Sequence, residues 1–125
     1  MGEVTCGGRK PVNPIGTCYD ATAHNFVAEP REWSSQAVIC HGIGIANHPE
    51  IYGQVITHAW IEDVKDNERL AFDCIWGFVV PVKKYREDAQ LNYVVEYTIE
   101  QFKFLWALHD YPGPFDEKIF ALTPP

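Results

Sequence analysis

The sequence predicts one α+β domain in which a helix precedes a set of antiparallel strands and a second helix follows them. Apolar residues recur at helical spacing from Tyr19 to Val27, and a second helical segment follows Thr98. Between these two segments, short β-branched stretches are separated by turn residues, which is typical of strands. A length of 125 residues suits a single domain, and no repeat or internal linker interrupts it. We therefore expect one domain over 1–125.

The beginning of the chain predicts an irregular arm followed by a helix. Residues 1–16 are rich in Gly and Pro and have no apolar period. Thr17 has the character of a helix N-cap, with Asp20 three residues later as in a capping box. Pro30 ends the apolar helical stripe. The prediction therefore places Cys18 in the first turn of an amphipathic helix.

Five strands are predicted in the middle of the chain. Their expected ranges are 37–45, 54–64, 69–76, 78–86 and 92–97. Alternation along the second of these puts His58 and Trp60 on one face and Ala59 on the other. A charged turn at 65–68 joins the second and third strands into a hairpin.

The end of the chain predicts a helix and then a loop. Thr98 and Gln101 form a capping-box pattern that opens a helix over about 99–109. The segment 111–125 contains Pro112 and Gly113 in its first residues, so we expect a turn followed by a loop tail.

Composition excludes several classes of function. The net charge of −7 disfavours nucleic-acid binding, because a phosphate backbone requires a basic face. Lys84 and Arg86 are interpreted as the solvated face of a strand. No stretch approaches the roughly 20 apolar residues of a membrane span, and Met1–Lys10 lacks the apolar core of a signal peptide. We expect a cytoplasmic protein that binds neither nucleic acid nor membrane and keeps its four cysteines reduced.

Cys18, His58 and Asp73 form a candidate catalytic triad. A cysteine nucleophile requires a favoured thiolate, a base within hydrogen-bond reach and a group that orients the base. The start of a helix favours the thiolate at Cys18 through unpaired N–H groups and the helix dipole. His58 lies on a strand, and Asp73 lies on the next strand of the hairpin. Asp73 can therefore accept a hydrogen bond from the second ring nitrogen of His58.

The order of these residues resembles the papain-like and transglutaminase-like cysteine enzymes. His58-Ala59-Trp60-Ile61-Glu62 followed by Ala71-Phe72-Asp73 is similar to the transglutaminase-like pattern, in which histidine, a small residue and tryptophan precede a strand ending in aspartate. The chain also resembles a group of small phage and bacterial proteins over about residues 13–117. The matching pieces are Cys18-Tyr19, His41-Gly42, His58-Ala59-Trp60, Tyr97-Thr98 and Gly113-Pro114-Phe115-Asp116, with Phe115 where tryptophan is expected.

This resemblance implies a papain-like fold, with the helix that carries Cys18 packed on an antiparallel sheet. It also implies acyl transfer at a thiol, by hydrolysis or transamidation of a peptide or protein amide through a thioester, without a cofactor. Such folds use the backbone N–H of Cys18 and a side-chain amide just upstream as oxyanion donors, and Asn13 is the nearest amide. Trp60 and His41 are candidates for the lining of the substrate groove.

Other interpretations of these residues stay open. Cys18 can also be interpreted as a small buried apolar residue, and His58 as a hydrogen-bonded structural histidine. Cys40 and Cys74 are interpreted as core residues. A zinc site is disfavoured because no Cys-x-x-Cys or His-x-x-x-His spacing occurs. The alternative function is a non-catalytic papain-like scaffold that binds a protein, such as a phage-encoded inhibitor of a host protein. A small acidic chain suits the capture of a basic surface.

Overall fold

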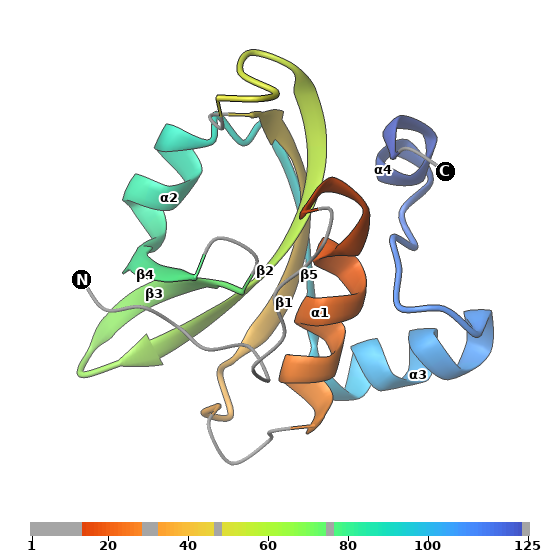
Figure 1. Ribbon diagram of the computed structural model, residues 1–125. Coiled ribbons are helices and arrows are strands. Elements are labelled where there is room, and N and C mark those ends of the chain that lie inside the picture. The colour runs from red at the N-terminus through yellow and green to blue at the C-terminus, as the bar shows by residue number, and fades with distance from the viewer. Residues whose placement is uncertain (1–13, 29–32, 47–48, 75–76, 124–125) are drawn as a thin grey trace.

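A computed structural model describes residues 14–28, 33–46, 49–74 and 77–123 of the chain (Figure 1). It is an α+β structure with one antiparallel sheet in the strand order β4-β3-β2-β1-β5. The strands are β1 Val38–Ile45, β2 Val55–Lys65, β3 Glu68–Asp73, β4 Phe78–Pro81 and β5 Tyr93–Thr98. The helices are α1 Pro14–Ala28, α2 Val82–Asp88, α3 Ile99–His109 and α4 Glu117–Leu122. The predicted α+β class and the antiparallel sheet are therefore confirmed.

Helices cover both faces of the sheet. In Figure 1 the short helix α2 lies on one side of the strands, and α1, α3 and α4 lie on the other. None of the helices in the described ranges is both long enough and apolar enough to cross a membrane.

The central hairpin forms as the sequence predicts. Lys65 at the end of β2 pairs with Glu68 at the start of β3. The two residues between them, Asp66 and Asn67, have φ values of 52° and 65°. A two-residue turn with positive φ at both positions matches the right-handed twist of the flanking strands. This turn fixes the register of β2 against β3.

Register also decides which side chains share a face. His58 lies opposite Gly42 and Trp60 opposite Cys40, whereas Ala59 lies opposite His41. Directly opposite residues point to the same face of an antiparallel pair. The predicted alternation of His58 and Trp60 against Ala59 is therefore confirmed, and His41 belongs to the face opposite that of His58.

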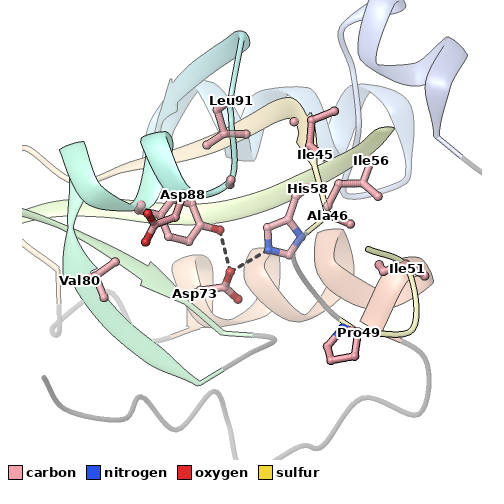
Figure 2. A pocket seen from close by; sticks show the side chains of 13 residues that line it. Ile45, Ala46, Pro49, Ile51, Ile56, His58, Asp73, Val80, Asp88 and Leu91 are labelled. Carbon is pink, nitrogen blue, oxygen red and sulfur yellow. Dashed lines mark hydrogen bonds and ion pairs between the residues drawn. The ribbon is translucent and has the colours of Figure 1, made fainter. Parts of the chain in front are cut away.

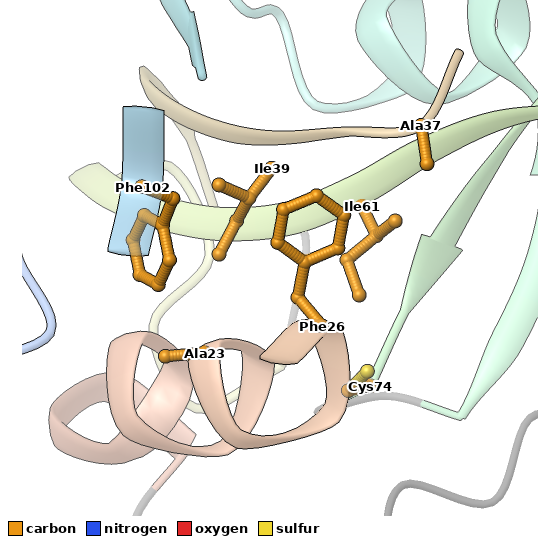
Figure 3. Packing of buried hydrophobic residues seen from close by; sticks show 7 residues of the cluster. All are labelled: Ala23, Phe26, Ala37, Ile39, Ile61, Cys74 and Phe102. Carbon is orange, nitrogen blue, oxygen red and sulfur yellow. The ribbon is translucent and has the colours of Figure 1, made fainter. Parts of the chain in front are cut away.

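The core on the α1 side positions the helix that carries Cys18. Figure 3 shows Phe26 of α1 packed between side chains of the sheet and of α3. The buried members of this cluster are Ala23, Phe26, Ala37, Ile39, Ile61, Cys74 and Phe102. Burying one large apolar side chain contributes about 1.5–3 kcal/mol. Packing of the cluster therefore fixes α1 against β1 and β2.

Two predicted helix and strand boundaries are wrong. The first helix begins at Pro14 and not at Thr17, in agreement with the preference of proline for the first helical position. Residues 82–86, predicted as the end of a strand, form α2. Pro81 ends the strand because it has no N–H to donate, and Lys84 pairs with Asp88 one turn later at 2.9 Å.

The predicted loop tail contains a helix. Helix α4 spans Glu117–Leu122, and the Asp116 side chain caps it by accepting the N–H groups of Lys118 and Ile119. Ile119 is fully buried against the sheet side of α1. The expected capping box of α3 is confirmed, because the Thr98 and Gln101 side chains each accept the other residue's backbone N–H.

The expectation of four reduced thiols is wrong for Cys74, which is disulfide-bonded. Cys18 and Cys40 are buried, and neither is in a disulfide. Cys6 lies outside the described residues.

Candidate functional site

The structure brings His58 and Asp73 together, as the sequence predicts. His58 Nε2 lies 2.9 Å from Asp73 Oδ2 (Figure 2). Pairing between β2 and β3 ends at Ile61 opposite Phe72. On the β3 side no strand of the described residues pairs with His58, so the carboxylate at the end of β3 has room to meet the imidazole ring.

Tyr85 completes this pair and was not foreseen from the sequence. Its hydroxyl donates to the same Asp73 oxygen, Oδ2, at 2.6 Å. Tyr85 lies on α2, in the segment predicted to be a strand. The signal that would have found it is helical: Pro81 before the segment and the Lys84–Asp88 spacing indicate a helix whose inward face carries Tyr85.

Cys18, on α1, contacts the same histidine. Its side chain forms a hydrogen bond with the His58 ring. Because Nε2 faces Asp73, Nδ1 is the ring nitrogen that remains for Cys18. Cys18 is 0% exposed and packs with Ala59 and Ile43. The three predicted residues are therefore connected by hydrogen bonds in one series, from Asp73 through His58 to Cys18.

The charges and hydrogen bonds around His58 favour its protonated form. Burial alone would lower the pKa of His58, but the charge and hydrogen bond of Asp73 and the contact with Cys18 outweigh it and raise the pKa to about 10. His58 is thereby placed to exchange a proton with the Cys18 side chain. The pKa of Tyr85 is raised well above its ordinary value by burial and by the Asp73 charge, so it stays a donor to Asp73.

The oxyanion site expected from the resemblance is not supported at Cys18. In an α-helix the N–H of residue 18 faces the carbonyl of residue 14. Since α1 begins at Pro14, Cys18 is its fifth residue, and its N–H is directed to the helix itself. Cys18 also lies beyond the first turn, where the dipole acts most strongly. Asn13, the other predicted donor, lies outside the described residues.

An apolar cavity of about 310 Å³ adjoins the histidine and the aspartate. Figure 2 shows it between the ends of β1 and β2, the α2 segment and the loop that follows β1. Its polar lining comes from His58, Asp73, Tyr85 and Asp88. The apolar lining residues are Gly44, Ile45, Ala46, Pro49, Ile51, Ile56, Val80, Ala89 and Leu91. Cys18 does not line this cavity.

The two residues predicted to line the groove lie elsewhere. Trp60 is fully buried, lies tilted against Tyr85 with ring centroids 5.3 Å apart, and donates its Nε1–H to Glu62 at 2.9 Å. His41 is fully buried on the α1 face, among the rings of Tyr19 and Phe115 and two others. Register places His41 on the face away from the cavity. Trp60 shares the face of His58 and stacks on its ring, with centroids 6.3 Å apart, so it is a core residue that covers the histidine.

A metal centre gains no support from the described residues. Cys40, Glu62 and Glu96 are the one group there with ligand atoms within 4.8 Å of one another. Arg86 Nη2 already lies 2.8 Å from Glu62 and 2.9 Å from Glu96. A guanidinium therefore occupies the position of the cation, and burial raises the pKa of the Cys40 thiol well above its ordinary value.

Comparison with known proteins yields no match to a family model, a curated protein or a solved structure.

Proposed function

We propose that this protein is a thiol-dependent acyltransferase or amide hydrolase of papain-like fold that uses Cys18, His58 and Asp73. The observation that carries the proposal is the continuous hydrogen-bonded chain from Asp73 Oδ2 to His58 Nε2 and from the His58 ring to Cys18. Nucleophile, base and orienting group are the three parts that such chemistry requires. A cysteine helix packed on an antiparallel sheet also agrees with the proposed fold.

The proposed reaction has two steps. The Cys18 thiolate attacks the carbonyl carbon of an amide, and His58 gives its proton to the departing amine as the C–N bond breaks. This leaves a thioester on Cys18 and a neutral imidazole. Water or a second amine then attacks the thioester while His58 takes its proton, which releases the acid or the new amide and restores the starting protonation state. Asp73 holds the ring and stabilises the imidazolium.

The burial of Cys18 determines how this proposal can be tested. Because the side chain is 0% exposed, its reaction with a reagent depends on local opening as well as on the thiolate fraction. Burial raises the pKa of the Cys40 thiol, so the diagnostic comparison is wild type against His58→Gln at each cysteine. Cys40 serves as an internal control for opening, since it too is in no disulfide and is 0% exposed. Its peptide reports opening without a histidine partner.

The decisive experiment is alkylation by iodoacetamide from pH 5 to 10, followed by peptide mass spectrometry. We expect Cys18 to react well below pH 8.5, the approximate pKa of an ordinary thiol, and much faster than Cys40. His58→Gln is expected to remove this low-pH reaction while leaving Cys40 unchanged. If Cys18 follows Cys40 at every pH and does not respond to His58→Gln, the catalytic proposal is wrong.

A second candidate function is a protein-binding module on the same scaffold. Exposed apolar side chains favour it: Phe104 and Leu108, one turn apart on α3, are 66% and 64% exposed, and Phe120 on α4 is 57% exposed. Large exposed apolar groups are typical of interaction sites when they gather on one face. An ordinary thiol at Cys18 in the alkylation experiment would favour this second function.

The sequence predicts a cytoplasmic location. The disulfide bond of Cys74 argues against it, because structural disulfides are rare in a reducing cytosol.

A further inference from the structure

We propose that the apolar cavity beside His58 is the pocket for the acyl group of the substrate, and that this group is aliphatic and uncharged. This inference rests on the proposed function and names its substrate class. An acyl group that joins Cys18 as a thioester has its carbonyl carbon beside the His58 ring, because His58 contacts Cys18. His58 also lines the cavity. The rest of the acyl group then extends from His58 into the cavity.

The walls of the cavity determine the chemistry of its occupant. Ile45, Ile51 and Ile56 form one side, and Val80 and Leu91 form the other (Figure 2). Ligand pockets gain affinity from such apolar walls, while a few polar groups fix orientation. In this cavity the polar groups lie at the His58–Asp73–Tyr85 end and at Asp88. An aliphatic chain therefore buries its carbons between the isoleucines and Leu91.

Charge excludes an acidic acyl group. Two aspartates, Asp73 and Asp88, line the cavity. Lys84 lies 2.9 Å from Asp88, but both side chains of that pair are 56% exposed, so it screens the cavity little. The imidazolium of His58 offsets the charge of Asp73, which leaves Asp88 as the unbalanced charge at the cavity. A substrate carboxylate placed among the apolar walls would lose its hydration and face this like charge. We therefore expect discrimination against a substrate with a terminal carboxylate.

The experiment measures acylation of Cys18 by p-nitrophenyl esters, read as p-nitrophenol release and as a mass increase on the Cys18 peptide. The esters are acetate, octanoate and the anionic monosuccinate. We expect octanoate to react at least about tenfold faster than acetate, in line with the selectivity of apolar pockets, and monosuccinate to react slowest. Equal rates for all three would overturn the inference and leave the proposed function standing.

Two variants test the cavity itself. Ile56→Trp fills it from β2, and we expect the octanoate preference to fall about tenfold. Leu91→Trp repeats the test from the opposite wall, in case either variant fails to fold. Val55→Trp is the matched control: Val55 is the preceding residue of β2, is 59% exposed and does not line the cavity. An unchanged preference in both cavity variants would overturn the inference.

Binding separates failure of the pocket from failure of the chemistry. Octanamide binding to Cys18→Ala is measured by calorimetry, with and without Ile56→Trp. Binding that Ile56→Trp abolishes supports the pocket even if no ester acylates Cys18, and in that case only the proposed catalysis is wrong. If octanamide does not bind and no ester reacts, both proposals are overturned.

Discussion

At the scale of single residues, one carboxylate oxygen organises the site. Asp73 Oδ2 accepts from Tyr85 at 2.6 Å and lies 2.9 Å from His58 Nε2. Asp73 is 1% exposed, so water does not replace these partners. A buried carboxylate requires donors of this kind, because an unpaired buried charge is costly. Tyr85 is therefore a positioning residue that acts on His58 through Asp73.

Removal of the Tyr85 hydroxyl tests this role. We expect Tyr85→Phe to lower the free energy of unfolding by about 1–3 kcal/mol, since a buried acceptor loses a donor. We also expect slower alkylation of Cys18 near neutral pH with an altered pH profile. Tyr93→Phe is the matched control, because its hydroxyl donates at 2.7 Å to Asp116, away from the site. A loss of stability with an unchanged Cys18 profile would make Tyr85 merely structural.

The sequence predicts the local part of this site better than the part that depends on register. His58 and Asp73 follow from strand patterns and the hairpin turn that brings them together. Cys18 follows from an amphipathic helix, although that helix begins at Pro14, four residues before Cys18. His41 was misplaced because it lies opposite Ala59, and a shift of one residue in register moves every side chain to the other face. Tyr85 was missed because its segment was interpreted as a strand.

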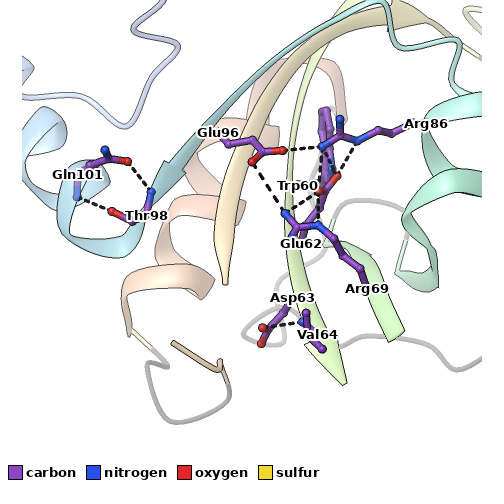
Figure 4. Close-up of polar contacts among 9 residues, drawn as sticks. All are labelled: Trp60, Glu62, Asp63, Val64, Arg69, Arg86, Glu96, Thr98 and Gln101. Atoms are coloured by element: carbon purple, nitrogen blue, oxygen red, sulfur yellow. Dashed lines mark hydrogen bonds and ion pairs between the residues drawn. The ribbon is translucent and has the colours of Figure 1, made fainter. Parts of the chain in front are cut away.

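At the scale of elements, a buried carboxylate holds α2 to the sheet. Glu62 of β2 is fully buried, and Arg86 of α2 donates to both of its oxygens at 2.9 Å (Figure 4). Arg69 of β3 donates to Glu62 as well, at 3.1 Å. Paired donors from two elements satisfy the charge, which is the condition for burying it. This contact positions α2, and with it Tyr85.

Substitution of Arg86 tests the attachment of α2. We expect Arg86→Ala to lower the free energy of unfolding by about 1–3 kcal/mol, because Glu62 loses one of its two guanidinium partners. Lys84→Ala on the same helix removes only an exposed ion pair with Asp88 and is expected to cost at most about 0.5 kcal/mol. Urea unfolding measures both changes. Equal losses would show that the Glu62 contact does not hold the helix.

The elements that the sequence mispredicted are short and depend on tertiary packing. Helix α2 has 7 residues and α4 has 6, and isolated helices of such length are marginal in water. Ile119 of α4 is stabilised by burial against α1 and β1 residues, which no local pattern reveals. The longer elements, including α3 with its capping box, carry enough periodicity to be predicted from the sequence.

At the scale of the whole molecule, a buried neutral histidine makes stability depend on pH. His41 is fully buried, and among the described residues neither ring nitrogen has a hydrogen-bond partner. Gly113 packs so closely that a Cβ there would lie 2.5 Å from His41 Cε1. Burial, together with the nearby charge of His58, lowers the pKa of His41 from its ordinary value of 6.5 to about 3.

Protonation of His41 therefore opposes the folded state. Below pH 6.5 the unfolded chain binds a proton at this position that the folded protein does not bind until about pH 3, so stability falls as pH falls through this window. The slope for one proton is about 1.4 kcal/mol per pH unit. His58 adds no slope below pH 6.5, because its raised pKa leaves it protonated in both states there; its contribution is lost as pH rises toward about 10.

Urea unfolding at pH 6.5, 5.75 and 5 measures this effect. We expect a loss of about 2 kcal/mol across the range in the wild type, and a much smaller loss in His41→Phe, which fills the same space without a basic group. His24→Gln is the control, because His24 lies at the surface beside Asp20 and should leave the slope unchanged. The same slope in His41→Phe would show that another group is responsible.

The two edge strands of the sheet, β4 and β5, differ in their capacity to pair with a strand from another molecule. On one side β4 ends at Pro81, which has no N–H, and α2 begins at the next residue. The β4 edge therefore has only three residues with backbone N–H donors. On the other side β5 is six residues long and contains no proline. Lengthening of the sheet by strand addition, whether by self-association or by an extended peptide, would therefore start at β5.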